Sequence, residues 1–235
     1  MNGMQYVWLL WSGAFLLAWS LLYLLRPGFR HKMLRVSLWT SLLGLSEPLF
    51  VPTYWNPPSL FDLAQRTGFD IESLIFCFAI GGIGAVSYNA VTGGRMAELT
   101  HDERHAGRHR WHRLAIAAPF LAFPVLYFLP WNPIYPGIAA LTLGGIANVL
   151  CRPDLLRNTL TGGLLFLSLY ATFMLLLVIF APGYIEQVWN LPAISGVALA
   201  GIPLEELVFG FAFGLYWAGI YEHFTWHRSQ FNQGA

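Results

Sequence analysis

The stretch GIPLEELVFGF, from Gly201 to Phe211, places two adjacent glutamates between apolar runs. Its pattern of acidic and aromatic positions occurs a second time in FDIESLIFCF, from Phe69 to Phe78. Glu72 of the earlier stretch corresponds to Glu205 of the later one. A pattern that recurs in this way indicates a structural unit that occurs twice in the chain.

The composition indicates a membrane protein. Of 235 residues, 56% are hydrophobic and only 11% are charged, and the mean hydropathy is +0.54. A soluble domain carries roughly a quarter of its residues as charges. The two cysteines, Cys77 and Cys151, lie far apart and provide neither a disulfide framework nor a metal-ligand spacing, so we expect both to be buried as small hydrophobic residues.

Seven apolar segments approach the length of roughly 20 residues that a helix needs to cross a bilayer. They lie near residues 4–25, 34–51, 71–91, 114–130, 136–151, 157–181 and 194–221. Short loops rich in Lys and Arg stay on the cytoplasmic side. An outside N-terminus and an inside C-terminus place every basic residue except Arg66 on the inner side, with Lys32 in the first inner loop. The sequence therefore predicts an all-α, multi-pass protein of the cell membrane.

The ends of the repeated unit also correspond. Leu25-Arg26-Pro27 closes the first segment, and Cys151-Arg152-Pro153 closes the fifth. The repeat thus covers three segments, with the fourth as a connector, and an odd connector gives both halves the same orientation. We predict a parallel 3+1+3 architecture with a first repeat over 1–92, a basic loop and linker helix over 93–133, and a second repeat over 134–235.

Four acidic residues lie toward the outer side of the predicted membrane segments. Glu205 and Glu206 stand about a third of the way into the last segment, Glu72 begins the third, and Glu47 lies near the outer end of the second. Burying an ionised carboxylate costs about 3 kcal/mol at the bilayer centre, and no Lys or Arg is available there as a partner. We expect at least one of the four to be protonated at neutral pH, with Glu205 as the reactive acid and Glu206 as its partner or second base. The alternative is that these acids serve as structural hydrogen-bonding groups.

The heptapeptide Pro203-Leu-Glu-Glu-Leu-Val-Phe209 resembles the Pro-x-Glu-Glu-x-x-Phe motif of the lycopene cyclase domain family. That domain is a three-helix membrane unit, found as the two subunits of heterodimeric bacterial carotenoid cyclases and fused in tandem in archaeal and fungal proteins. The resemblance covers the chain as two tandem copies. The first copy departs from the motif, because Asp70-Ile-Glu-Ser73 lacks the proline and the second glutamate.

The resemblance implies an isomerase that cyclises a linear, lycopene-type polyene end group without net redox change. Such a reaction needs a proton for a terminal double bond, a carbocation held during ring closure, and a base that removes a proton. The catalytic residues that we predict are the four buried acids Glu205, Glu206, Glu72 and Glu47, and nothing in the sequence calls for a cofactor or a metal. The implied partners are a long isoprenoid or carotenoid substrate and the lipid bilayer. A second copy of the chain or another carotenoid enzyme is the expected protein partner, and no nucleic acid is expected.

Two other functions remain open from the sequence. Parallel three-helix repeats also build small-solute or lipid transporters, and a cyclase-like protein can serve as a catalytically silent partner. The loop from Leu99 to His112 spaces His101, His105 and His109 four apart, which suits a metal if the loop is helical. Gly107 interrupts that spacing, so we expect a cytoplasmic loop that faces anionic lipid.

Overall fold

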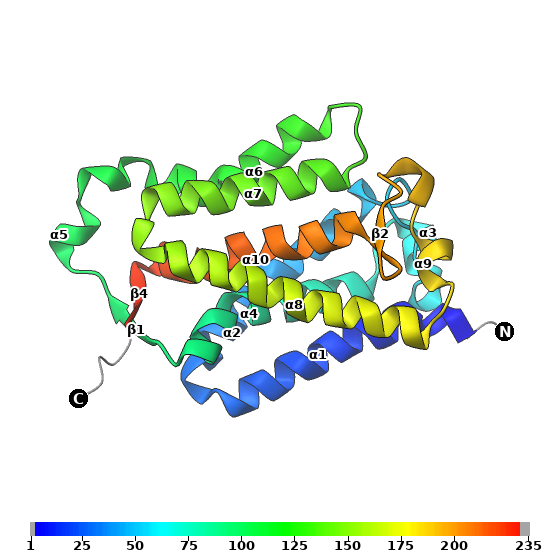
Figure 1. The fold of residues 1–235 in the computed structure, drawn as a ribbon, viewed down its shortest axis with the longest axis horizontal. Helices are drawn as coiled ribbons and strands as arrows, with labels where there is room; N and C mark the ends of the chain where they lie inside the picture. The colour runs from blue at the N-terminus through cyan, green and yellow to red at the C-terminus, as the bar shows by residue number, and fades with distance from the viewer. Residues whose placement is uncertain (1–2, 231–235) are drawn as a thin grey trace. The chain divides into compact units, whose positions relative to one another are not determined.

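A computed structural model describes residues 3–230, which are mainly helical (Figure 1). The α-helices are α1 (Val7–Leu25), α2 (Arg30–Ser41), α3 (Leu63–Thr67), α4 (Ile71–Thr92), α5 (His101–Arg104), α6 (His112–Tyr127), α7 (Ile134–Cys151), α8 (Leu156–Phe180), α9 (Tyr184–Val188) and α10 (Leu204–Thr225). The short strands are β1 (Arg95–Glu98), β2 (Ala198–Leu199), β3 (Ile202–Pro203) and β4 (His227–Gln230). The predicted all-α class is confirmed.

Four helical stretches within residues 3–230 are long and apolar enough to cross a membrane. They are Met4–Leu25, Ile71–Thr92, Ile134–Cys151 and Pro153–Phe180. They coincide with the first, third, fifth and sixth predicted segments. The number of seven spans and their orientation stay predictions.

The second and fourth predicted segments form shorter α-helices than expected. The second continues from α2 as a 3-10 helix, η3 (Leu42–Leu49), which contains Pro48. Proline has no backbone N–H and disfavours helical geometry in the residue before it, which limits the α-helix there. The fourth corresponds to α6, which has 16 residues and contains Pro119 and Pro124. Lys32, expected in an inner loop, lies in α2 and is buried.

The seventh predicted segment begins ten residues too early. Its first part forms the β2–β3 hairpin, in which Gly201 takes a positive φ of 81°. Glycine adopts this backbone conformation without steric cost, so the chain turns there instead of continuing a helix. The helix α10 starts at Leu204, and Glu205 and Glu206 therefore lie in its first turn. Their expected place, a third of the way into the segment, was wrong.

Two pairs of local structures agree with the predicted repeat. Arg26 precedes the 3-10 turn Pro27–Phe29 with φ −125° and ψ 66°, and Arg152 precedes Pro153–Leu155 with φ −127° and ψ 74°. The helices α4 and α10 each have 22 residues and carry glutamate in the first turn. The repeat and its three-part division of the chain stay predictions.

The chain forms two compact units, and α4, α7, α8 and α10 each contribute to both. The first unit comprises Met1–Ile83, Asn132–Tyr135 and Leu169–Val208. Its core is rich in aromatic rings, such as Phe15 stacked on Phe173 with ring centroids 3.9 Å apart. A Cβ atom on Gly81 would lie 2.2 Å from Thr40 Oγ1. Glycine at this position of α4 therefore permits close contact with α2.

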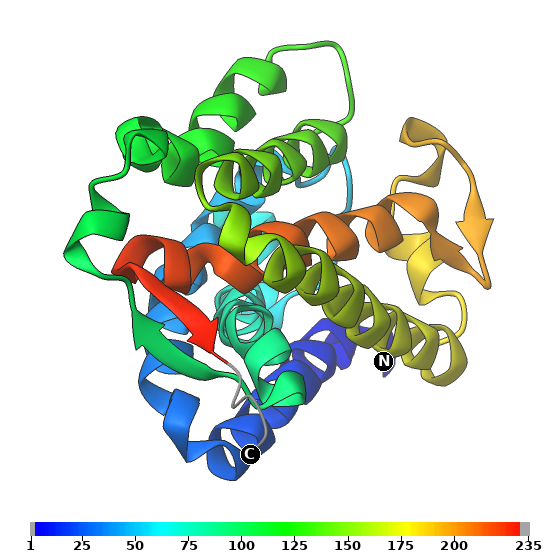
Figure 2. The same ribbon diagram turned by 60° about the vertical axis from the view of Figure 1, so that its left-hand side comes forward.

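The second unit comprises Gly84–Trp131, Pro136–Ser168 and Phe209–Ala235. Within it, α10 presents the pattern Gly214-x-x-x-Ala218 to α8, and a Cβ atom on Gly162 would lie 2.1 Å from Ala218 Cβ. Small residues at such positions let two helix backbones approach closely. The strands β1 and β4 form an antiparallel ribbon, in which Arg95 pairs with Gln230 and Glu98 with His227 (Figure 2).

Candidate active site

The four predicted acids lie in the first compact unit. Glu47 belongs to η3, Glu72 to the first turn of α4, and Glu205 and Glu206 to the first turn of α10. All four side chains are buried, with exposed fractions between 1% and 7%. The fold thus brings acids from three elements into one unit and removes them from solvent, and the burial expected from the sequence is confirmed.

Glu206 is held by three hydrogen-bond donors. Tyr54 donates its hydroxyl to Oε1, and Trp189 donates its indole N–H to the same oxygen at 2.7 Å. Tyr170 donates its hydroxyl to Oε2 at 2.5 Å. An indole N–H can only donate, so the Glu206 carboxyl group acts as an acceptor toward it.

The backbone brings Tyr54 and Trp189 to the same carboxyl group. The segments on either side of these residues pair through Asn56 N to Val188 O and Asn190 N to Tyr54 O, both at 2.8 Å. Tyr54 lies in the loop after η3, and Trp189 follows α9 directly. Burial, followed by the charge of Glu206, raises the pKa of Tyr54 well above its usual value. The Tyr54 hydroxyl therefore keeps its proton and donates it in the hydrogen bond.

Glu205 has a different set of partners. Its Oε1 accepts hydrogen bonds from the Tyr135 hydroxyl at 2.8 Å and from the Ser195 backbone N–H at 2.9 Å. Its Oε2 is buried and has no hydrogen-bond partner among residues 3–230. One oxygen of this carboxyl group is thus fixed, and the other is uncommitted.

Glu47 and Glu72 share this arrangement. Glu47 Oε2 accepts from the Ser73 hydroxyl at 2.9 Å, and Glu72 Oε1 accepts from the Leu60 backbone N–H at 2.7 Å. In the described part of the chain, the second oxygen of each carboxyl group is buried without a partner. A protonated carboxyl group can place its hydroxyl at such an uncommitted position.

Aromatic rings lie beside Tyr170, one of the hydrogen-bond donors to Glu206. The ring of Tyr170 lies 6.1 Å from that of Phe15 and 6.4 Å from that of Phe76, and Trp8 lies 5.3 Å from Phe76. These rings come from α8, α1, α4 and the start of α1. The faces of aromatic rings attract cations electrostatically, so this lining suits a positively charged intermediate.

Several residues of this region were missed in the sequence. Asp70 is buried and accepts a hydrogen bond from the Ser73 backbone N–H at the start of α4, and burial raises its pKa. An Asp directly before a helix start is a local signal for such a cap. Tyr54 and Tyr170 have no comparable signal, since they meet Glu206 from distant parts of the chain. Trp189 is also buried.

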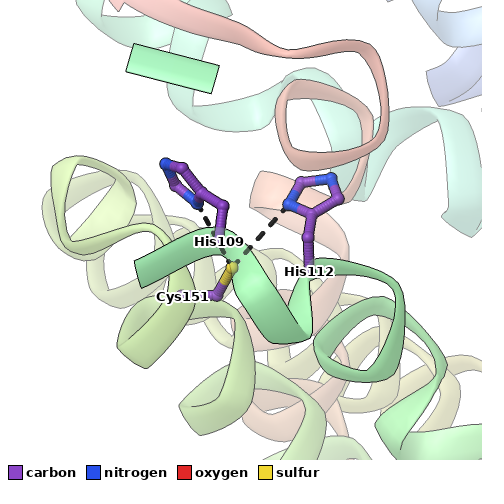
Figure 3. A group of neighbouring side chains, drawn as sticks. All are labelled: His109, His112 and Cys151. Atoms are coloured by element: carbon purple, nitrogen blue, oxygen red, sulfur yellow. Dashed lines mark hydrogen bonds between the residues drawn. The ribbon is translucent and has the colours of Figure 1, made fainter. Parts of the chain in front are cut away.

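A second cluster of polar side chains lies in the second unit. The Sγ of Cys151 lies 3.5 Å from His109 Nδ1 and 3.7 Å from His112 Nδ1 (Figure 3). The regularly spaced His101, His105 and His109 do not form a cluster, because His101 and His105 are exposed in and beside α5 while His109 is buried, and the lipid-facing role expected for this loop stays a prediction. Cys151, expected to be a plain hydrophobic residue, has two imidazole neighbours.

No curated protein and no solved structure matches the chain. A match exists at the level of protein families. It covers under half of the chain and includes Tyr135, Tyr170, Trp189, Glu205 and Glu206, whereas Glu47, Glu72 and Tyr54 lie outside it. The range that matches is residues 132–224, and the family is described as lycopene cyclase.

Proposed function

We propose that this protein is a carotenoid cyclase of the membrane, which closes a ring at a linear, lycopene-type polyene end by acid catalysis without net redox change. One observation carries the proposal. The range that matches the lycopene cyclase family contains two adjacent buried glutamates, and their hydrogen bonds differ in the way that an acid and a base require.

Glu205 is the proposed proton donor. Its Oε1 is fixed by Tyr135 and Ser195, and its uncommitted Oε2 can carry a proton toward the substrate. Transfer of that proton to the terminal double bond leaves a tertiary carbocation. A neighbouring double bond of the polyene then attacks the cation, which closes the ring and moves the positive charge onto a ring carbon.

Glu206 is the proposed base. Three donors hold its oxygens, which suits a carboxylate that stabilises the cation and finally accepts a proton from the ring. One proton enters and one leaves, so the product is an isomer of the substrate. The rings of Phe15, Phe76 and Tyr170 add a cation-stabilising lining beside this carboxylate.

Glu72 and Glu47 are proposed as further acids of the same site. Glu72 stands at the position of Glu205 in the predicted repeat, and each of the two acids has one uncommitted, buried oxygen. The matching turns at Arg26 and Arg152 support the parallel 3+1+3 repeat. We accordingly retain seven spans, an outside N-terminus and a cell-membrane location as part of the proposal.

The test is pigment analysis of cells that accumulate lycopene and express the intact protein or a variant. The intact protein should yield a cyclic carotene with the mass of lycopene. Membranes that contain the protein and are given unlabelled lycopene in heavy water should yield a product with one added deuterium per ring. Glu205→Gln should lower the yield by about 10²–10⁴-fold, as expected for loss of a general acid. Glu186→Gln removes an exposed acid of α9 and is the matched control, with unchanged yield.

Unchanged lycopene with intact protein present in the membrane would refute lycopene cyclisation. The same result would direct attention to a transporter, a lipid-binding protein or a catalytically silent partner. Full activity of Glu205→Gln would instead refute the assignment of the proton donor while leaving the reaction in place.

A further inference from the structure

The cluster of His109, His112 and Cys151 has no part in the proposed cyclisation. The three donor atoms lie within 4.8 Å of one another, and all three side chains are buried. His109 comes from the 3-10 helix Gly107–Trp111, His112 begins α6, and Cys151 ends α7. Figure 3 shows the Nδ1 atoms of both imidazole rings directed toward the sulfur.

The two sulfur–nitrogen distances of the cluster match edges of a zinc coordination shell. Zinc binds Cys sulfur at about 2.3 Å and His nitrogen at about 2.0–2.1 Å in tetrahedral geometry. Ligands at these bond lengths stand about 3.6 Å apart for sulfur and nitrogen, and about 3.3 Å apart for two nitrogens. The sulfur of Cys151 lies 3.5 Å from His109 Nδ1 and 3.7 Å from His112 Nδ1.

His223 of α10 offers a further nitrogen. Its Nε2 lies 3.0 Å from His112 Nδ1, and its side chain is fully buried. A ring nitrogen has a single lone pair or a single proton, yet His112 Nδ1 faces both this imidazole and the Cys151 sulfur. A cation shared by these donors would satisfy both contacts at once.

The surroundings also suit a cation. Arg152 adjoins Cys151 in sequence, but its guanidinium group is paired with the Asp154 carboxylate through bonds of 2.9 and 2.6 Å, which offsets its charge. The ring of Trp226 stacks on His112 with centroids 3.7 Å apart and fixes the orientation of the imidazole.

We propose that His109, His112 and Cys151 bind a divalent transition-metal ion of the zinc class, with His223 as the fourth ligand. One thiolate and three imidazoles form a donor set that suits zinc. Four protein ligands leave no open position for a substrate, so the site is structural. It ties the segment around α6 to the ends of α7 and α10 within the second unit. The inference is independent of the proposed cyclisation.

The test uses the full chain, purified in detergent with an affinity tag that lacks histidine. Zinc content, measured by plasma mass spectrometry after dialysis against a weak chelator, should be about one ion per chain. Cys151→Ser and His112→Gln should lose most of the metal. His101→Gln and Cys77→Ser are matched controls, one an exposed histidine near the site and one a distant thiol, and both should retain it.

Replacing the bound metal with cobalt in the intact protein tests the proposal even if a ligand variant fails to fold. Cobalt bound by the intact protein should show a thiolate-to-metal charge-transfer band, because Cys151 is a ligand. Absence of that band, or absence of retained zinc in the intact protein after reconstitution, would overturn the proposal. Retention of the ion and band in folded Cys151→Ser would also overturn it, and unchanged zinc in His223→Gln would remove His223 from the ligand set.

Discussion

The contact between α8 and α10 allows a quantitative prediction for Gly162→Ala. The new Cβ atom would lie 2.1 Å from Ala218 Cβ, whereas carbon atoms pack best at about 3.5–4.0 Å. The helices must therefore separate by about 1.5 Å or distort locally. Such overpacking costs about 1–3 kcal/mol, which exceeds the gain of up to about 1 kcal/mol that alanine brings to a helix.

Gly13→Ala is the matched control for this change. Gly13 lies in the middle of α1, and a Cβ atom there would meet no other atom within 4 Å. Only the helix-propensity gain applies, so this variant should be more stable than the wild type. The two alanine variants should thus differ in free energy of unfolding by about 2 kcal/mol, or about 4–8 °C in Tm.

Thermal unfolding in detergent measures the difference, and a second substitution tests its cause. In the double variant Gly162→Ala with Ala218→Gly, the methyl group moves from one side of the contact to the other. The double variant should recover most of the stability that Gly162→Ala loses, which would be a coupling between neighbouring sites. Equal Tm values for Gly162→Ala and Gly13→Ala, or no recovery in the double variant, would refute the close approach of α8 and α10.

Two further predictions concern buried ionisable groups. Burial raises the pKa of Asp70. The folded protein therefore keeps the proton on the Asp70 carboxyl group at pH values where the unfolded chain has released it. As a result, Asp70 lowers the stability of the fold as the pH rises above about 4. Asp70→Asn keeps an oxygen for the Ser73 N–H and should reduce the fall of Tm between about pH 4 and 8; identical pH profiles would contradict this. Arg152 is fully buried and paired with Asp154, so Arg152→Gln should cost about 3–5 kcal/mol in chemical denaturation. Arg26, which corresponds to Arg152 in the predicted repeat, is exposed, so Arg26→Gln should cost less than about 0.5 kcal/mol. Similar losses of stability at both sites would show that burial of Arg152 is not the cause of its larger expected loss.

The sequence was sufficient to predict the helical class and the burial of the glutamates. Long apolar segments specify helices through hydrogen bonds that are all local, so the four helices long and apolar enough to cross a membrane could be predicted from composition and length. The start of α10 was not readable in this way. The apolar run continues through Val197, Ala198 and Leu199, and the turn depends on the backbone conformation of Gly201. Hydropathy carries no information about the sign of a φ angle.

The partners of Glu206 could not be predicted for a different reason. Tyr54 reaches it from a loop 152 positions earlier in the chain, and Trp189 reaches it from a segment that pairs with that loop. Neither residue has a spacing relative to Glu206 that a local pattern could detect. The cluster around His112 could not be predicted for the same reason. Regular spacing in the sequence pointed to His101 and His105, whereas the fold brings Cys151 and His223 close to His112.

The ribbon of β1 and β4 has a consequence for how the polypeptide could be divided. β1 follows α4, β4 follows α10, and the exposed segment α5 comes just after β1. A break at α5 would leave two polypeptides that remain joined by paired backbone groups, as when a strand from one protein adds to the sheet of another. The gene could therefore split into two genes during evolution, because the β1–β4 pairing would already hold the two polypeptide products together.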